Sequence, residues 1–145
     1  MKSLLQDCKI LKIEDSVSTG TAVTVSDVID TQGYDGVCFI YKLGAVTDAS
    51  VVTLQIAQGA ESGMGDTADL TGASATLTGS TDSEQSLVVD IVKPRERYLQ
   101  ASLTIATQNS ELDVGYCILY NPRKKPVSQP ATIDASTQVI SPAES

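Results

Sequence analysis

Apolar residues recur at every second position in several stretches of the chain, and this alternation is the feature that most limits its fold. In the stretch 99–105, leucine, alanine and isoleucine take the odd positions, while glutamine, serine and threonine take the even ones. A period of two is typical of β-strands that bury one face. Five such rows are expected to face a core: Val37, Phe39, Tyr41 and Leu43; Val52, Leu54 and Ile56; Leu87, Val89 and Ile91; Leu99, Ala101, Leu103 and Ile105; and Leu112, Val114, Tyr116, Ile118 and Tyr120.

Further strands and the turns between them complete the predicted fold. Three weaker stretches bring the expected number of strands to about eight: 8–13, 22–29 and 70–78. Turn-forming residues separate the rows, and Asn109-Ser110 is expected to turn the chain between the last two. Only residues 3–13 leave a short helix open as an alternative. The pattern therefore predicts an all-β fold, an antiparallel β-sandwich that is jelly-roll-like and has about eight strands.

The last 25 residues differ in composition from the rest of the chain. We predict a β-sandwich domain over residues 1–120, with 1–19 as a candidate N-terminal extension, and an extended arm over 121–145. Four of the five prolines lie in this arm, and its few apolar points are Val127, Ile133, Val139 and Ile140. Proline at this density favours an extended chain. Two interpretations stay open: a solvated tail, or an arm that docks on a neighbouring subunit.

The charges are unevenly distributed along the sequence. The net charge is −8, and the stretch 14–92 holds twelve acidic residues against the single base Lys42. Basic residues return in the last third, where Arg95 and Arg97 alternate with Glu96. These arginines either contact carboxylates of a partner or are solvated charges in a strand connection. The candidate partner contacts are Arg95, Arg97, Arg123, Lys124, Lys125 and Val127. An acidic chain without a basic, aromatic-rich face is not expected to bind nucleic acid.

The cysteines and the N-terminus suggest no special chemistry or targeting. The spacing of Cys8, Cys38 and Cys117 fits neither a zinc motif nor a disulfide framework, so we expect free thiols that act as small apolar side chains. No apolar run is long enough to span a bilayer, and the first residues lack the apolar core of a signal peptide. We therefore expect folding in a cytoplasm and no membrane contact.

No constellation of residues predicts catalysis. The chain has no histidine, which removes the usual general base. Two carboxylate pairs, Asp66 with Asp69 and Asp82 with Glu84, lie in Gly/Ser/Thr-rich loops and are interpreted as solvated loop residues rather than glycosidase sites. Calcium binding by Asp66 and Asp69 is the weaker alternative. We predict a protein that is not an enzyme, with no catalytic residue, no cofactor and no metal.

Several strings together resemble a known class of proteins. They are Asp30-Thr31-Gln32-Gly33-Tyr34-Asp35-Gly36-Val37, Gly44-Ala45-Val46, Thr53-Leu54-Gln55-Ile56, Val89-Asp90-Ile91, Pro94 with Arg97-Tyr98-Leu99, and Tyr120-Asn121-Pro122-Arg123-Lys124-Lys125-Pro126-Val127. Over residues 20–127 the chain resembles small structural proteins of tailed bacteriophages, of the head decoration or cement type. The motifs are structural ones, and the family has no catalytic residues to carry over.

The resemblance implies a jelly-roll-like subunit on the outside of an icosahedral capsid. Such a subunit bridges neighbouring capsomers, contacts the major capsid protein and acts as a dimer or trimer. It is made in the host cytoplasm and ends on the virion surface. Two alternatives remain: a tail or neck component of the same particles, or a carbohydrate-binding β-sandwich in which Tyr34, Tyr98 or Tyr120 forms the sugar platform.

Overall fold

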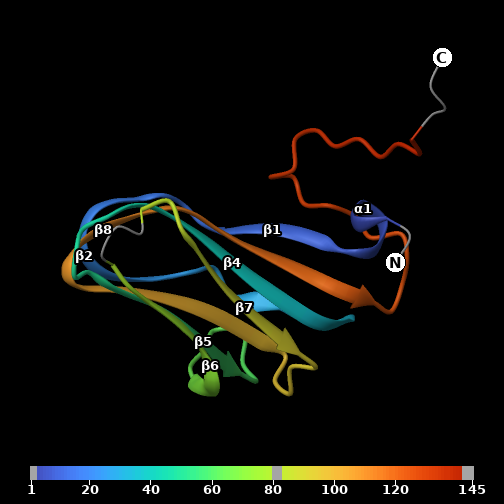
Figure 1. The fold of residues 1–145 in the computed structure, drawn as a ribbon. Coiled ribbons are helices and arrows are strands. Elements are labelled where there is room, and N and C mark those ends of the chain that lie inside the picture. Colours follow the sequence, from blue (N-terminus) through green and yellow to red (C-terminus); the bar gives the residue numbers. More distant parts are fainter. Residues whose placement is uncertain (1–2, 80–82, 142–145) are drawn as a thin grey trace.

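A computed structural model describes residues 3–79 and 83–141 and shows an antiparallel, nearly all-β chain with one very short helix (Figure 1). The prediction of an all-β, antiparallel fold is confirmed at this level. The elements in chain order are α1 (Leu4–Asp7), β1 (Lys9–Glu14), β2 (Val17–Val25), β3 (Ile29–Asp30), β4 (Tyr34–Val46), β5 (Val51–Gly59), β6 (Ala68–Thr78), β7 (Ser86–Val92) and β8 (Tyr98–Pro122).

The long strand β8 organises the whole sheet. The eight strands form one curled sheet in which β8 lies between β5 and β4, and β1, β2 and β3 also pair with β8. Residues 98–106 of β8 pair with β5 on one side and with β3 and most of β2 on the other. Residues 112–122 pair with β4 and β1. We call β6, β5, 98–106, β2 and β3 the β5 half of the sheet, and β7, β4, 112–122 and β1 the β4 half.

The inner rows of both halves contribute to one apolar core. Four of the five predicted rows, those in 37–43, 52–56, 87–91 and 99–105, are buried and belong to one apolar cluster. Phe39 of the β4 half and Leu103 of the β5 half are both fully buried there. Burial of these side chains is the main favourable term for folding, at about 1.5–3 kcal/mol for each large apolar side chain. For these rows the prediction from the period of two is confirmed.

The fifth row was predicted wrongly. Leu112 is buried, but Val114 and the even positions up to Tyr120 are only half-buried, while Cys117 and Leu119 face the core instead. The cause is a register shift in the pairing of β4 with β8, which skips Asp113 and switches the inward face from even to odd positions. The row from Val114 to Tyr120 therefore lies on the outer face of the β4 half.

The expected turn at Asn109-Ser110 is also wrong, because the chain bends there without leaving the sheet. Thr107 has a positive φ of 72°, and the strand continues on both sides of it. Ser110 is fully buried at the bend, 2.6 Å from the Ser50 hydroxyl, which also lies 2.9 Å from the carbonyl oxygen of Gln108. These contacts satisfy polar groups inside the bend, so two predicted strands become one strand shared by both halves.

Two of the three weaker strand predictions are confirmed, and the third stretch is interrupted. Strands β1 and β6 confirm the stretches 8–13 and 70–78, whereas the stretch 22–29 is broken into the end of β2 and the two residues of β3. Ser26 makes the break: its amide donates to the Ala101 carbonyl oxygen at 2.9 Å, and its hydroxyl accepts from the Ala101 amide at 3.0 Å. The short helix left open in residues 3–13 is present as the four residues of α1.

A buried polar pair links β1 to the core of the β4 half. The hydroxyl of Tyr41 donates to the carboxylate of Glu14, and both side chains are buried. Burial and this hydrogen bond raise the pKa of Tyr41 far above its usual value. Gly115 makes room for the ring, because a Cβ atom at this position would lie 2.7 Å from Cζ of Tyr41. The close approach of β8 to Tyr41 therefore requires glycine here.

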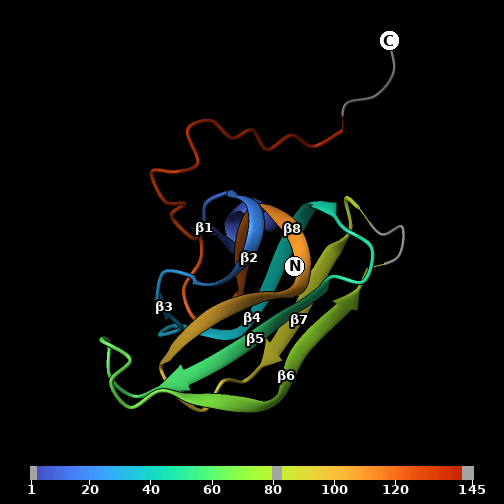
Figure 2. The same cartoon turned by 90° about the vertical axis from the view of Figure 1, so that its left-hand side faces the viewer.

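The chain leaves the sheet at Pro122 and continues without further strands over the described residues 123–141. In both views this segment lies beyond β1, on the side away from β5 and β6 (Figures 1 and 2). No helix in the described ranges is long and apolar enough to cross a membrane.

Candidate functional site

The turn between β3 and β4 brings together basic segments that are far apart in the sequence. The amide of Thr31 donates to the carbonyl oxygen of Arg97 at 2.9 Å, and the amide of Arg123 donates to that of Gly33 at 2.9 Å. The amide of Lys93 donates to the carbonyl oxygen of Asp35 at 2.7 Å. The residues before β8 and those after it therefore meet at one end of the molecule, where most of the predicted partner contacts lie.

Arg97 holds a carboxylate of its own chain. Its Nε and Nη2 atoms donate to the two oxygens of Asp30 at 2.9 and 2.8 Å, and the guanidinium lies 5.1 Å from the ring centre of Tyr98. This pairing lowers the pKa of Asp30. Arg97, for which sequence analysis left a partner's carboxylate and solvent as alternatives, thus makes a bidentate contact within the chain, while Arg95 is exposed beside it.

The basic cluster after β8 lies against the N-terminal segment. Arg123 approaches Asp35 at 3.9 Å, and Lys125 approaches the buried carboxylate of Asp7 at 3.4 Å. Lys124 is exposed, and Val127 is half-buried. At this end of the molecule the predicted contacts thus come from two segments of the chain. Arg95 and Arg97 precede β8, and the others follow it: Arg123, Lys124, Lys125 and Val127.

Gln129, which sequence analysis missed, fixes the arm to the body. Its side-chain Nε2 donates to the carbonyl oxygens of Leu5 at 3.0 Å and Cys8 at 2.6 Å, and its Oε1 accepts from the amide of Ile10 at 3.0 Å. The amide of Val127 adds a bond to the Gln6 carbonyl oxygen at 2.9 Å. The bond from Ile10 satisfies one amide on the edge of β1 that would otherwise be available to another chain. A glutamine between prolines carries no sequence signal for this role.

Beyond this anchor the arm makes little contact with the body. Residues 134–141 are all exposed, and the side chains of Val139 and Ile140 are 75% and 88% exposed. These two adjacent aliphatic residues bury little apolar surface within this chain. They are available for burial against a neighbour.

The acidic loop residues do not assemble a metal site. Both oxygens of Asp66 accept backbone amides, from Ala60 at 2.9 Å and Glu61 at 3.2 Å, and these bonds lower the pKa of Asp66. Asp69 lies in β6, in register with Ala57. Within residues 3–79 and 83–141 no three Cys, Asp or Glu side chains are grouped closely enough to hold a metal ion. The Asp66 carboxylate therefore stabilises the conformation of its own loop.

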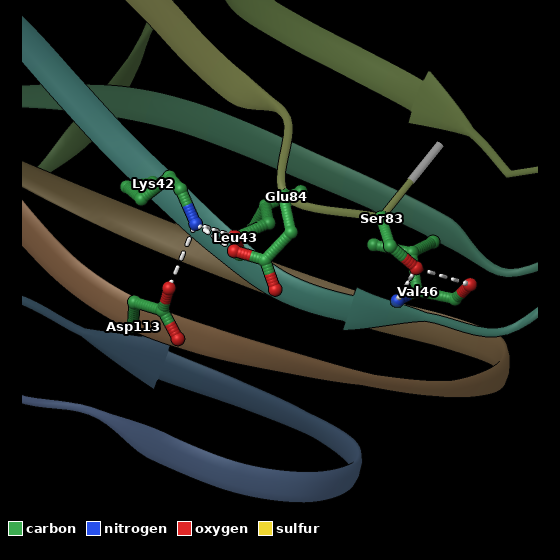
Figure 3. A network of polar contacts seen from close by, with 6 residues as sticks. All are labelled: Lys42, Leu43, Val46, Ser83, Glu84 and Asp113. Carbon is green, nitrogen blue, oxygen red and sulfur yellow. Dashed lines mark hydrogen bonds and ion pairs between the residues drawn. The ribbon is translucent and has the colours of Figure 1, made fainter. Parts of the chain in front are cut away.

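Glu84, one member of the second carboxylate pair, belongs to a small ionic network. Lys42 donates to Glu84, to Asp113 at 2.8 Å and to the Leu43 carbonyl oxygen at 2.7 Å (Figure 3). These acceptors raise the pKa of Lys42, so it is charged at neutral pH. Lys42 thereby joins β4, β8 and the segment before β7 at the surface. The other member of the pair, Asp82, lies outside the described residues.

The three cysteines form no disulfide bond. Cys8 and Cys117 are buried, and Cys38 is half-buried. Burial raises the pKa of the Cys117 thiol to about 12 and also raises those of Cys8 and Cys38. High pKa values keep all three protonated at neutral pH, which suits apolar packing rather than nucleophilic chemistry.

The tyrosines proposed for a sugar platform lie in three different surroundings. Tyr120 lies over Gly36, and its hydroxyl donates to Asp90 at 2.7 Å, on the outer face of the β4 half. Tyr98 lies under the Arg97 guanidinium, and Tyr34 is half-buried at the turn after β3.

Comparisons with known proteins add no assignment: no protein-family model matches the sequence, and no curated protein matches it.

Proposed function

We propose that this chain is a non-enzymatic structural subunit of a tailed-bacteriophage particle, of the capsid decoration type, that bridges neighbouring capsomers on the virion surface. Its partners would be the major capsid protein and other copies of itself, in a dimer or trimer. The resemblance of residues 20–127 to such proteins suggests the class. The observation that carries the proposal is the arm, which is anchored by Gln129 and then presents Val139 and Ile140 away from the body.

The arm has the physical features of a connector. Its base is fixed by four hydrogen bonds to the N-terminal segment, from Gln129 and Val127, so its direction is set before any partner is met. Burying each of two aliphatic side chains at a neighbour yields about 1.5–3 kcal/mol, which is weak for one contact. On a closed shell the same contact is repeated by symmetry, and many weak contacts then give firm attachment.

The curled sheet fits the proposed role as a rigid body. We further propose that its two halves act as the two layers of a jelly-roll-like sandwich. The support is the single cluster formed by the inner rows of both halves, with Phe39 from one and Leu103 from the other. A rigid two-layer body can transmit load between capsomers because its interior is closely packed.

Shell binding tests this proposal. The full chain is mixed with shells assembled from the major capsid protein encoded in the same genome, and the bound fraction is measured by co-sedimentation. We expect saturable binding, weakened at least about tenfold by the double substitution Val139→Asp and Ile140→Asp, which adds charge to a surface that must be desolvated. The control Ala135→Asp changes an exposed residue of the same segment and should bind like the wild type.

Two outcomes would overturn the proposal. One is the absence of binding to shells at tens of micromolar chain. The other is binding to isolated tails or necks instead of shells, which electron microscopy of assembled particles would show directly and which would support the tail or neck alternative.

A further inference from the structure

The outer face of the β4 half is largely apolar, although an outer face normally carries polar side chains. Ile40 of β4 lies in register with Tyr116 of β8 and with Val88 of β7, while the neighbouring rows combine apolar side chains with Asp90, Lys42 and Ser86. Strands with one face in water should alternate apolar with polar residues. The apolar or sulfur-containing members of this face, which we call the outer apolar face, are Ile10, Cys38, Ile40, Val88, Val92, Val114, Tyr116, Ile118 and Tyr120.

Part of this face is open to solvent. Val88 and Val92 are 53% and 65% exposed, and the remaining members are half-buried. The free part of the arm, residues 134–141, is itself exposed throughout. Apolar side chains gathered on four strands form a larger surface than the scattered single residues found on most monomers, and such surfaces mark binding sites.

The charged groups on and around this face have hydrogen-bonding or ionic partners within the chain. Lys12 pairs with Asp15 at 2.5 Å, and Lys42 pairs with Asp113 at 2.8 Å. Asp90 accepts the Tyr120 hydroxyl at 2.7 Å. Covering the face would therefore leave no buried charge without a partner, which is the condition for a stable interface. A strongly charged partner would gain nothing here.

We propose that two copies of this chain pack face to face through the outer apolar face. This inference rests on the self-association named in the proposed function and adds the surface that carries it. Neighbouring strands lie about 4.8 Å apart, and residues on the same face of a strand lie about 6.8 Å apart, so the face on these four strands has an area of about 500 Å². A dimer would therefore bury about 1,000 Å² over both copies, which reaches the lower limit of specific interfaces. The same apolar surface on both partners satisfies the self-complementarity that a two-fold interface requires.

The shape of the face supports sheet-on-sheet packing. Gly36 leaves a gap in β4 that the ring of Tyr120 fills, since a Cβ atom at residue 36 would lie 2.1 Å from Cζ of Tyr120. The ring thereby lies across the sheet instead of standing out from it. A level surface of aliphatic and aromatic side chains can approach a second such surface to about 10 Å between sheets.

Two matched valine substitutions test the proposal by sedimentation velocity from about 5 to 200 μM. Val88→Lys places a charge on the outer apolar face at an edge strand, whereas Val23→Lys makes the same change at a 67% exposed valine in β2 of the β5 half. We expect a dimer for the wild type and for Val23→Lys. Val88→Lys should raise the dimer dissociation constant at least about 100-fold, because two lysines would be buried per dimer. Circular dichroism should show the same β content in all three proteins.

Cys38 gives a second readout that needs no substitution. It lies on this face between Ile118 and Asp90, and the other two thiols are buried. Its alkylation by iodoacetamide should slow at least about tenfold between 5 and 200 μM wild-type chain, but not in Val88→Lys. A monomeric wild type at 200 μM, or equal effects of the two valine substitutions, would overturn the proposal.

Dimer formation and shell binding can fail independently of each other, so the two tests can be told apart. The variant with Val139→Asp and Ile140→Asp should remain a dimer while it loses shell binding. If that variant is a monomer and Val88→Lys is a dimer, the copies associate through their arms and the face-to-face proposal is wrong. If the oligomeric states of all variants are as expected but neither the wild type nor any variant binds shells, only the proposed decoration role fails.

Discussion

The two halves of the sheet share one core and one strand, yet the centres of their outer faces differ in character. In the β5 half, Thr53 of β5 lies between Thr104 of β8 and Thr76 of β6, one neighbouring row carries serine and glutamine, and the exposed Val23 and Val25 lie on β2. In the β4 half, the matching central position is Ile40, between Tyr116 and Val88. Since the inner rows are alike, the difference outside cannot be a requirement of the core.

The comparison teaches where to look for function in such a chain. A threonine-rich outer face suits a strand exposed to water, because threonine favours the extended backbone and remains solvated. An isoleucine- and tyrosine-rich outer face costs solubility unless it is covered. The β5 half therefore has the composition of a face in contact with water, and the β4 half has that of a face that meets another surface.

The largest expected effect tests whether the two halves truly share one core. Phe39→Ala in the β4 half should lower the free energy of unfolding by about 3–5 kcal/mol, and Leu103→Ala in the β5 half should lower it by about 2–5 kcal/mol. Both side chains are fully buried, so each substitution leaves a cavity. Urea denaturation monitored by circular dichroism measures both. A single cooperative transition in each variant is expected. Two separate transitions, or a loss below 1 kcal/mol in either, would mean that the halves do not form one packed unit.

The sequence already contained the contrast between the halves. Residues 99–105 alternate strictly and gave the correct inner row, whereas 37–41 and 116–120 are continuous apolar runs. A continuous run is the pattern of a strand covered on both faces. The period of two then cannot tell the inner from the outer face, so the row from Val114 to Tyr120 was assigned to the core when it lies outside.

Other features could not be predicted because they depend on contacts distant in sequence. The bend at Thr107 is possible only because Ser50 supplies a partner to buried Ser110, sixty residues away. Gln129 binds three backbone groups in 5–10, and nothing in its neighbourhood marks it. Arg97 was predicted as a candidate partner contact, but the carboxylate that it binds is Asp30 of its own chain, which the sequence pattern alone does not reveal.

The second prediction concerns a polar contact present only in the core of the β4 half. Tyr41→Phe removes the donor to buried Glu14, whose other oxygen has no hydrogen-bond partner within the described residues. A buried carboxylate left without a partner should cost about 2–3 kcal/mol in unfolding free energy. Tyr120→Phe removes a hydroxyl bonded to exposed Asp90 and should cost less than about 1 kcal/mol. Equal losses in parallel denaturation curves would argue against the buried pair.

The same pair gives the protein a pH dependence in the alkaline range. The pKa of Tyr41 is raised in the folded state from the ordinary value of 10.0, so the unfolded chain loses its proton first. The stability due to this shift is complete below pH 10 and declines as the pH rises further, by at most about 1.4 kcal/mol per unit for one group. Tyr41→Phe should flatten the decline between pH 10 and 12. An unchanged slope in that variant would assign the effect to other tyrosines.

The third prediction tests how the outer apolar face is kept level. Gly36→Ala forces the Tyr120 ring off the sheet and should cost about 1–3 kcal/mol. Gly20→Ala, in β2, meets no atom closer than 3.9 Å and should change stability by less than about 1 kcal/mol. Adding Tyr120→Ala to Gly36→Ala should recover part of the loss, which a double-mutant cycle measures. Strict additivity in that cycle would show that the ring and the glycine are not in contact.

The smallest effect is expected at the turn that joins the two halves, where each half contributes one ion pair. Asp30 is held by two hydrogen bonds from Arg97 on the β5 side, whereas Asp35 is 3.9 Å from Arg123 on the β4 side. Asp30→Asn should lower Tm by at most about 2 °C, because the pair is about half exposed and screened by water, and Asp35→Asn should have no measurable effect.

The sign of the pH dependence at this turn follows from the lowered pKa of Asp30. The unfolded carboxyl takes up its proton first, so the contribution is present above about pH 4 and is lost as the pH falls through the lower folded pKa. The Tm difference between wild type and Asp30→Asn should therefore vanish near pH 2 and shrink in 1 M NaCl. A difference that persists in both conditions would mean that Asp30 stabilises the turn through its bond from the Gln32 amide at 3.0 Å rather than through Arg97. In that case Arg97, like exposed Arg95, would be free to bind a partner's carboxylate, as its place in the sequence first suggested.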